Sequence, residues 1–111
     1  MASLHQKHCV PCEGKTEPLT ISEAKKLLNN LNKWSLEEGS QSIWKLYAFE
    51  NFYQTMAFAN AVAFTAHSED HHPTLIITYK SCRVTYTTHA VRGLSENDFI
   101  CAAKLDQLVQ I

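Results

Sequence analysis

The sequence lacks several features that mark common classes of protein. Its three glycines form no glycine-rich phosphate loop, and neither an H-E-x-x-H nor a G-x-S-x-G motif is present. These absences argue against nucleotide hydrolysis, zinc peptidase activity and common acyl transfer. No apolar run reaches the length of a membrane span, and the first eight residues lack the apolar centre of a signal peptide. We therefore expect a soluble, cytoplasmic protein without a membrane partner.

The net charge and the chain length limit the class of protein and the number of domains that we expect. The net charge is −1 without a basic run, so the sequence has no electrostatic footprint for nucleic acid. A chain of 111 residues, 45% apolar and 19% charged, suits one small globular domain whose modest core favours a homo-oligomer. We expect an extended lead-in at residues 1–18 and a single domain at residues 19–111.

The cysteines leave three interpretations of the lead-in open. Cys9 and Cys12 form a C-x-x-C pair, which is half of a structural zinc site that His5 or His8 would complete. The same spacing occurs in redox motifs, although those follow a strand and open a helix. The third interpretation, which we favour, is a loose or locally packed segment without a metal. The other two cysteines lie in strand and helix patterns, where the side chain is usually buried: Cys82 and Cys101. We expect all four thiols to be reduced.

The first half of the domain predicts a helix and a strand hairpin. Thr20 and Glu23 form a capping box, apolar residues follow at helical spacing, and the asparagines from Asn29 onward favour the helix end. A glycine turn then separates a short strand at 34–37 from an alternating strand at 43–50. One face of the second strand contains Ile43, Lys45, Tyr47 and Phe49.

Residues 51–68 switch to a helical period and are apolar on most sides. One stripe contains five residues, and three more widen it: Phe52, Met56, Ala59, Ala63 and Ala66, with Phe58, Val62 and Phe64. A helix with so much apolar surface is expected to be buried on two sides. In so small a domain, we infer that the second side contacts another subunit.

The second half predicts another hairpin and a final helix. Strands at 74–79 and 82–88 flank a two-residue turn, which would place residue 74 opposite residue 87. Ser95 and Asp98 form a second capping box that begins the last helix. The order α-β-β-α-β-β-α predicts an α+β fold, with three helices packed on one face of a four-stranded antiparallel sheet.

A histidine cluster is the main chemical signal. The string His71-His72-Pro73 marks a helix–strand junction, because proline biases the residue before it toward extended backbone. In the predicted hairpin His89 reaches the same end, and Asp98 reaches it if the last helix folds back over the sheet. Histidine titrates near neutral pH, so histidines in one pocket can act as an acid–base pair that a carboxylate orients.

Each of these residues also has an ordinary structural interpretation. The histidine pair suits an exposed junction, and His89 suits an exposed strand end. Asp98 already has a role in its capping box. A metal site is a further alternative, but neighbours on extended backbone point to opposite faces, so His71 and His72 rarely bind one ion together. We therefore predict no metal ligand among them.

The spacing of these residues resembles the signature of the pterin-4a-carbinolamine dehydratase family. The signature runs from His71-His72-Pro73 through Tyr79 and His89 to Asp98. The stretches 87–89, 93–98 and 18–20, Trp34 and the order of elements are similar as well, so the resemblance covers nearly the whole chain.

One departure from the family pattern is visible. Many members have a glutamate four residues before the first histidine of the pair, where this chain has His67. Glu69 and Asp70 are close in sequence but are expected to point elsewhere on the helix. We expect His67 to take the supporting role.

The resemblance implies a hydro-lyase that needs no cofactor. Its substrate would be 4a-hydroxytetrahydropterin and its product quinonoid dihydropterin, so the reaction would recycle the cofactor of aromatic amino-acid hydroxylases. It implies His71 and His89 as the acid–base pair and His72 as a binding and orienting residue. Asp98 would orient one imidazole or the polar edge of the pterin. Pro73 and His67 are likewise implied as binding or orienting residues. A hydroxylase partner and a homodimer or homotetramer are also implied.

Two other function classes stay open. Animal relatives also act as a dimerisation cofactor of a transcription factor through a helical surface, which would make this chain a protein-interaction module with an incidental site. The intact histidines and Asp98 argue against binding alone. The other class is a small zinc-binding regulator built on Cys9-x-x-Cys12 and the histidines, which metal analysis would separate from the first two.

Overall fold

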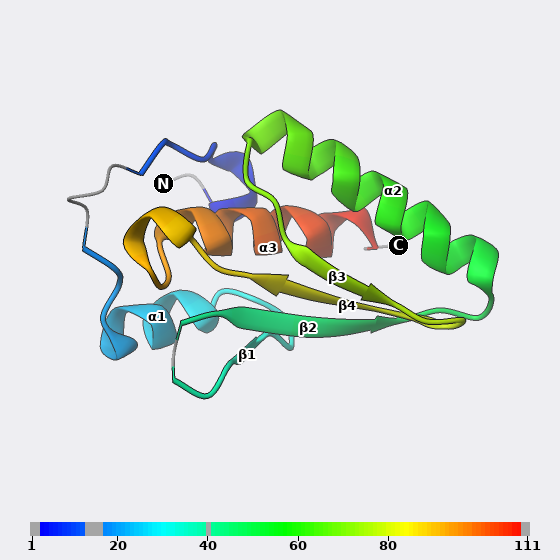
Figure 1. The fold of residues 1–111 in the computed structure, drawn as a ribbon, viewed down its shortest axis with the longest axis horizontal. Helices are drawn as coiled ribbons and strands as arrows, with labels where there is room; N and C mark the ends of the chain where they lie inside the picture. Colours follow the sequence, from blue (N-terminus) through cyan, green and yellow to red (C-terminus); the bar gives the residue numbers. More distant parts are fainter. Residues whose placement is uncertain (1–2, 13–16, 40, 110–111) are drawn as a thin grey trace.

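The predicted order α-β-β-α-β-β-α is confirmed in the computed structural model, which describes residues 3–12, 17–39 and 41–109 (Figure 1). The helices are α1 (Ile21–Leu28), α2 (Phe52–Glu69) and α3 (Glu96–Leu108). The strands are β1 (Ser35–Leu36), β2 (Ile43–Ala48), β3 (Thr74–Ile77) and β4 (Ser81–Tyr86). Two unpredicted 3-10 turns are η1 (Leu4–Gln6) and η2 (His89–Val91). Within the described ranges, no helix combines the length and the hydropathy that a bilayer crossing requires.

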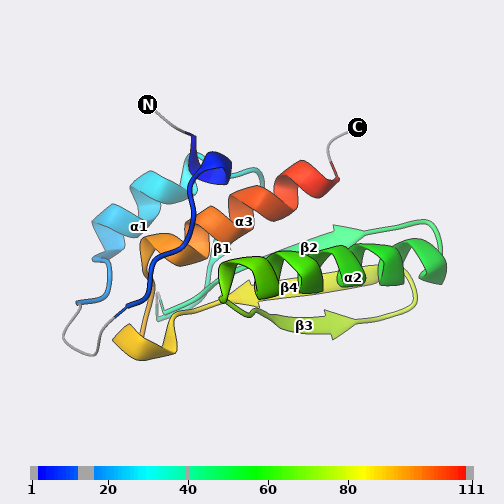
Figure 2. The same cartoon turned by 90° about the horizontal axis from the view of Figure 1, so that it is seen from above.

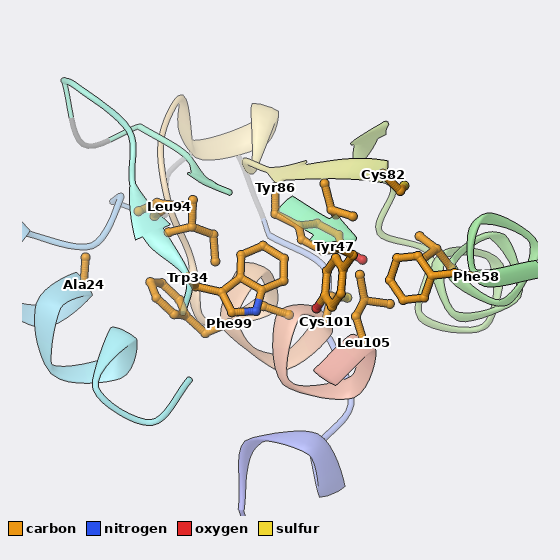
Figure 3. Packing of buried hydrophobic residues seen from close by; sticks show 14 residues of the cluster. Ala24, Trp34, Tyr47, Phe58, Cys82, Tyr86, Leu94, Phe99, Cys101 and Leu105 are labelled. Atoms are coloured by element: carbon orange, nitrogen blue, oxygen red, sulfur yellow. The ribbon is translucent and has the colours of Figure 1, made fainter. Parts of the chain in front are cut away.

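The strands form one antiparallel sheet in the order β1-β2-β4-β3, and the helices cover one of its faces (Figures 1 and 2). Alternation along the two central strands turns these side chains into the core: Ile43, Tyr47, Cys82, Val84 and Tyr86. The inward face of β4, with Cys82, Val84 and Tyr86, was predicted from the sequence. Figure 3 shows this cluster packed against Trp34 and against Phe99 and Leu105 of α3. The core therefore lies between the middle of the sheet and the last helix.

Capping boxes begin α1 and α3, as predicted. The Glu23 amide donates to Thr20 Oγ1 at 3.2 Å, and the Glu23 carboxylate accepts from the Thr20 amide at 2.9 Å. At the start of α3 the Ser95 amide donates to the Asp98 carboxylate at 3.0 Å. These contacts satisfy amide groups that a helix start leaves without intrahelical partners, so the two helices begin at defined residues.

The β3–β4 hairpin is shifted by two residues from its predicted register. Thr74 lies opposite Thr85 rather than residue 87, and the Thr78 amide donates to the Ser81 carbonyl at 2.9 Å. The turn therefore falls at Tyr79 and Lys80, not at Lys80 and Ser81, because neither dipeptide has the glycine or asparagine that would mark it. A shift of two residues preserves the face of every side chain, so the predicted core of β4 is correct.

The predicted apolar stripe of α2 is confirmed in part. The buried residues of the helix are Thr55, Phe58, Ala59, Val62, Thr65 and Ala66, and Phe58, Ala59, Val62 and Ala66 belong to the predicted set. Phe52 and Phe64 of the predicted set are exposed, at 49% and 74% of their surface. Thr55 tolerates burial because its hydroxyl has a hydrogen-bond acceptor. Its Oγ1 lies 3.1 Å from the Asn51 carbonyl oxygen and 3.1 Å from the Tyr79 carbonyl oxygen. Hydropathy alone cannot distinguish two faces of a helix that is apolar nearly all round.

The lead-in is packed along the last helix rather than loose. Turn η1 contacts α3, and Lys104 of α3 donates to the His5 carbonyl at 2.9 Å. The segment that follows, drawn in blue in Figures 1 and 2, passes between the end of α2 and the start of α3. Residues 7–12 are called the N-terminal segment below.

Candidate active site

The ends of two helices bring His71 and Asp98 together. Helix α2 stops because Asp70 adopts left-handed backbone, with φ 50° and ψ 45°, and the His71 amide then donates to the Ala66 carbonyl at 3.1 Å. Asp98 lies in the first turn of α3, which folds back over the sheet as the sequence argument required. His71 Nε2 lies 2.6 Å from Asp98 Oδ1. An ionised carboxylate only accepts hydrogen bonds, so Nε2 donates and Nδ1 is left for other partners.

Asp98 is fully buried and hydrogen-bonded at both oxygens. Its Oδ2 accepts from the Thr88 hydroxyl at 2.8 Å and from the Ser95 amide at 3.0 Å. Thr88 Oγ1 and Ser95 Oγ are also 2.8 Å apart. Among the described residues, His71 is the one side chain within ion-pair distance of this carboxylate. A buried charge requires a partner, so Asp98 favours the donor form of His71 and fixes its ring.

Tyr86 forms the floor beneath His71. The two rings are stacked with centroids 5.6 Å apart and an interplanar angle of 6°. Burial, with the nearby Cys101, Cys9 and Asp98, raises the pKa of the Tyr86 phenol, so the ring stays neutral. Its buried hydroxyl has no hydrogen-bond partner within the described part of the chain. Tyr86 therefore orients the imidazole by packing, not by a hydrogen bond.

A cavity of about 490 Å³ opens above this pair. Four parts of the chain line it: residues 9–12, residues 69–72, residues 87–90 and Asn97. The three histidines predicted as a cluster, His71, His72 and His89, all line this cavity. The His71 side chain is mostly buried, whereas His72 and His89 are exposed at the cavity surface. His89 begins η2 rather than ending a strand, because β4 stops at Tyr86 and Thr88 then pairs with Gly93.

Other predicted residues lie around or outside this cavity. Glu69 and Asp70 line it, so the expectation that they point elsewhere is wrong: the helix ends between them and turns the chain back. His67 is on the exposed side of the last turn of α2, and Pro73 is half-buried beyond the histidine pair. Neither is part of the cavity lining.

The lining residues that sequence reasoning missed come from the N-terminal segment and from Asn97. The Asn97 side-chain nitrogen donates to the Val10 carbonyl at 2.6 Å, and its oxygen accepts from the Val10 amide at 3.0 Å. No periodic signal marks these contacts, because they join positions 87 residues apart. The segment forms one wall of the cavity.

Glu69 holds the same segment from the end of α2. It accepts from the Cys9 amide at 2.7 Å and lies 2.9 Å from His8 Nδ1. Burial would raise the pKa of this carboxyl, but the Cys9 hydrogen bond, His8 and Lys104 outweigh burial and lower it. Glu69 is therefore a charged anchor for the wall.

The cysteines do not assemble with the lead-in histidines. In the described ranges, no three side chains among His, Cys, Asp and Glu gather in a metal-binding arrangement. Cys9 Sγ lies 3.4 Å from Cys101 Sγ, whereas Cys12 Sγ lies 3.6 Å from the Asn97 side-chain nitrogen. These contacts pack the segment against α3.

A larger cavity of about 820 Å³ lies near the other end of α3. Its charged residues already satisfy one another, since Asp106 accepts from Lys45 at 2.7 Å and from Tyr47 at 2.6 Å. Trp34 Nε1 donates to the same carboxylate at 3.1 Å. This network joins strands to α3, whereas the three clustered histidines, His71, His72 and His89, line the smaller cavity.

The family model of pterin 4 alpha carbinolamine dehydratase matches residues 17–108. A protein of Nitrosospira multiformis, provisionally named a pterin-4-alpha-carbinolamine dehydratase, is 53% identical over 108 residues, covering 97% of this chain and 94% of its own length. A Legionella pneumophila protein with the same provisional name is 49% identical over 109 residues, covering 97% of this chain and 96% of its own.

Solved structures are similar as well. A transcriptional coactivator/pterin dehydratase from Brucella melitensis has a TM-score of 0.81 and 30% identity, covering 85% of this chain and all of its own. A pterin dehydratase-like protein identified as a RuBisCO assembly factor in the alpha-carboxysome has a TM-score of 0.61 and 23% identity. It covers 69% of this chain and 89% of its own, and this second likeness shows the fold alone.

Proposed function

Because this chain belongs to the pterin 4 alpha carbinolamine dehydratase family, we propose that it dehydrates 4a-hydroxytetrahydropterin to quinonoid dihydropterin. The reaction breaks the bond between C4a and its hydroxyl oxygen and removes the proton from N5. One group must protonate the leaving hydroxyl, and another must accept the N5 proton. The products are the quinonoid pterin and water, so neither a metal nor a redox cofactor is required.

The observation that best supports this proposal is the His71–Asp98 pair at 2.6 Å, in a cavity that His72 and His89 also line. Two proton-transfer groups are the minimum for the reaction, and histidine exchanges protons near neutral pH. The buried carboxylate fixes the ring of His71, which leaves Nδ1 available to a bound substrate.

We assign the roles as follows. His71 and His89 form the acid–base pair, and His72 binds and orients the pterin. Asp98 is a positioning residue that acts through His71. Pro73 keeps the histidine pair extended, and His67 supports the pair from the end of α2. In a pathway, the substrate would come from an aromatic amino-acid hydroxylase, whose cofactor the reaction would recycle.

The test is the decay of freshly generated 4a-hydroxytetrahydropterin, followed by ultraviolet absorbance with the spontaneous rate subtracted. We expect wild-type protein to accelerate the decay and both His71→Ala and His89→Ala to approach the background rate. His5→Ala is the matched control, because His5 lines the other cavity, and it should retain full activity. Folded wild-type protein that leaves the decay at its spontaneous rate would overturn the proposal.

A second candidate function is a protein-interaction module, and the outer face of α2 favours it. Tyr53 and Phe64 expose 83% and 74% of their surface there, beside Phe52. Apolar aromatic side chains in one area mark interaction surfaces. We propose that this face joins copies of the chain into a homodimer or homotetramer, and a transcription-factor partner is the alternative occupant. Sedimentation of wild type and Phe64→Glu tests this, since loss of a wild-type oligomer in the variant is expected.

A further inference from the structure

The C-x-x-C pair is split in the folded chain, and Cys9 has a different sulfur beside it. Cys9 Sγ lies 3.4 Å from Cys101 Sγ, although the two residues are 92 positions apart. Both are free thiols. Cys101 is fully buried in α3, whereas Cys9 is half-buried and lines the cavity that contains the histidines. The proposed dehydration uses neither sulfur.

Cys9 is held in this position by its neighbours on both sides. Its amide donates to Glu69 at 2.7 Å, and its thiol lies 3.6 Å from the Asn97 carbonyl oxygen. The next residue, Val10, is bound twice by the Asn97 side chain, at 2.6 Å and 3.0 Å. A disulfide bond is about 2.05 Å long, so the sulfurs need to approach by about 1.4 Å.

We propose that Cys9 and Cys101 are a peroxide-oxidisable thiol pair whose disulfide fixes the N-terminal segment as a wall of the cavity. The oxidant is hydrogen peroxide, a small molecule that reaches Cys9 through the open cavity. This inference does not depend on the proposed dehydratase activity, because it concerns the sulfurs and the segment alone.

The reaction divides into two balanced steps. The Cys9 thiolate attacks one peroxide oxygen, the oxygen–oxygen bond breaks, and hydroxide leaves to become water as Cys9 becomes a sulfenic acid. The Cys101 sulfur then attacks the Cys9 sulfur, the sulfur–oxygen bond breaks, and the hydroxyl leaves as a second water with the Cys101 proton. Two thiols are oxidised and one peroxide is reduced to two waters.

The environments of the two sulfurs indicate which one reacts with peroxide first. Cys9 is accessible from the cavity, so it meets the oxidant first. The hydrogen bond with Cys9, together with burial, raises the pKa of the Cys101 thiol, so Cys101 is the less reactive of the two toward peroxide. Cys101 lies one helical turn after Asp98, so the disulfide would tie the cavity wall to the helix that positions His71.

The first measurement is a thiol count on the full-length, reduced protein after treatment with stoichiometric hydrogen peroxide. We expect the count under denaturing conditions to fall from four to two, with a Cys9–Cys101 linked peptide in the digest. Cys12→Ser and Cys82→Ser should form the same link. Cys9→Ser should form no disulfide, so its thiol count should not fall by two. This substitution does not alter the buried core, so the variant is expected to fold. Cys101→Ala is the second test if circular dichroism shows that it folds.

The second measurement is hydrogen exchange of the Cys9 and Val10 amides, which should slow in the oxidised protein as the segment is fixed. A Cys9–Cys12 link, a link between two chains on a non-reducing gel, or sulfinic acid at Cys9 without a link would overturn the proposal. So would unchanged thiols after peroxide treatment. These results are distinct from failure of the dehydratase assay, which reports on the histidines.

Discussion

Replacing Asp98 by asparagine tests the central pair of the site while nearly preserving its shape. In the wild type, Asp98 accepts from His71 Nε2 at 2.6 Å and from Thr88 and Ser95 at its other oxygen. The side chain of asparagine has a single oxygen, so it can accept either from His71 or from Thr88 and Ser95, but not from both sides. If its oxygen faces Thr88 and Ser95, its NH₂ group donates to Nε2, and the proton of a neutral His71 moves to Nδ1. Nδ1, the nitrogen that we propose faces the substrate, then no longer accepts a proton.

The size of the effect follows from the contact that is lost. A hydrogen bond to a charged group contributes about 1.5–3 kcal/mol, and neither partner is well hydrated here, since the His71 side chain is 12% exposed and Asp98 is fully buried. At 1.36 kcal/mol for each factor of ten, we expect kcat to fall by roughly 10- to 150-fold. The free energy of unfolding should fall by about 1–2 kcal/mol, because a weaker acceptor remains in the capping box.

The assay is the pterin absorbance decay, with kcat and KM measured separately and unfolding followed by urea titration. Asp106→Asn is the matched control on the same helix, because it removes a partly buried charge that Lys45 and Tyr47 contact outside the site. It should lose stability and retain kcat. The reasoning would be refuted if folded Asp98→Asn kept the wild-type kcat, or if both variants lost activity in proportion to stability.

Three further predictions concern stability. Glu69 has a lowered pKa when folded, so its contribution is complete above the unfolded value of 4.5 and is lost as pH falls through the lower folded pKa. Urea titrations should therefore show Glu69→Gln less stable than wild type by about 2 kcal/mol at pH 7, with a smaller difference below pH 4.5. Tyr86→Phe removes a buried hydroxyl without a partner in the described ranges, so unfolding free energy should stay constant or rise by about 1 kcal/mol. A clear loss of stability in urea would contradict that account. Thr20→Ala removes the α1 cap and should lower the unfolding free energy by about 1 kcal/mol in the same titration, whereas Ser at this position should restore it.

Much of the fold was predictable because local patterns and tertiary packing agree. Alternation placed Val84 and Tyr86 in the core, and the Thr20–Glu23 box marked the start of α1. The α2 stripe was predictable only in part, since Ala59 and Val62 are buried as expected whereas Phe64 is exposed. That choice depends on which face meets the sheet and α3, and apolar residues on most sides of the helix do not specify it.

The site was predictable to the extent that its residues lie next to strand and helix ends. The hairpin argument placed the histidine pair and His89 at one end, and an error of two residues in register did not alter that conclusion. The contact between His71 and Asp98 required the fold of α3 over the sheet, which the sequence permitted without requiring. Asn97 was missed and Glu69 was expected to point elsewhere, because ordinary polar residues on helices have no pattern that identifies a distant backbone partner.

The placement of the N-terminal segment has a practical consequence for how this protein is shortened or tagged. The family match begins at residue 17, so a chain trimmed to that boundary would keep His71, His72, His89 and Asp98. It would also lose residues 9–12, which close one side of the cavity. Kinetic constants measured on such a chain would describe the proposed proton-transfer groups in a site that is open to bulk water. A tag fused just before Lys7 would likewise sit within a few residues of the cavity wall.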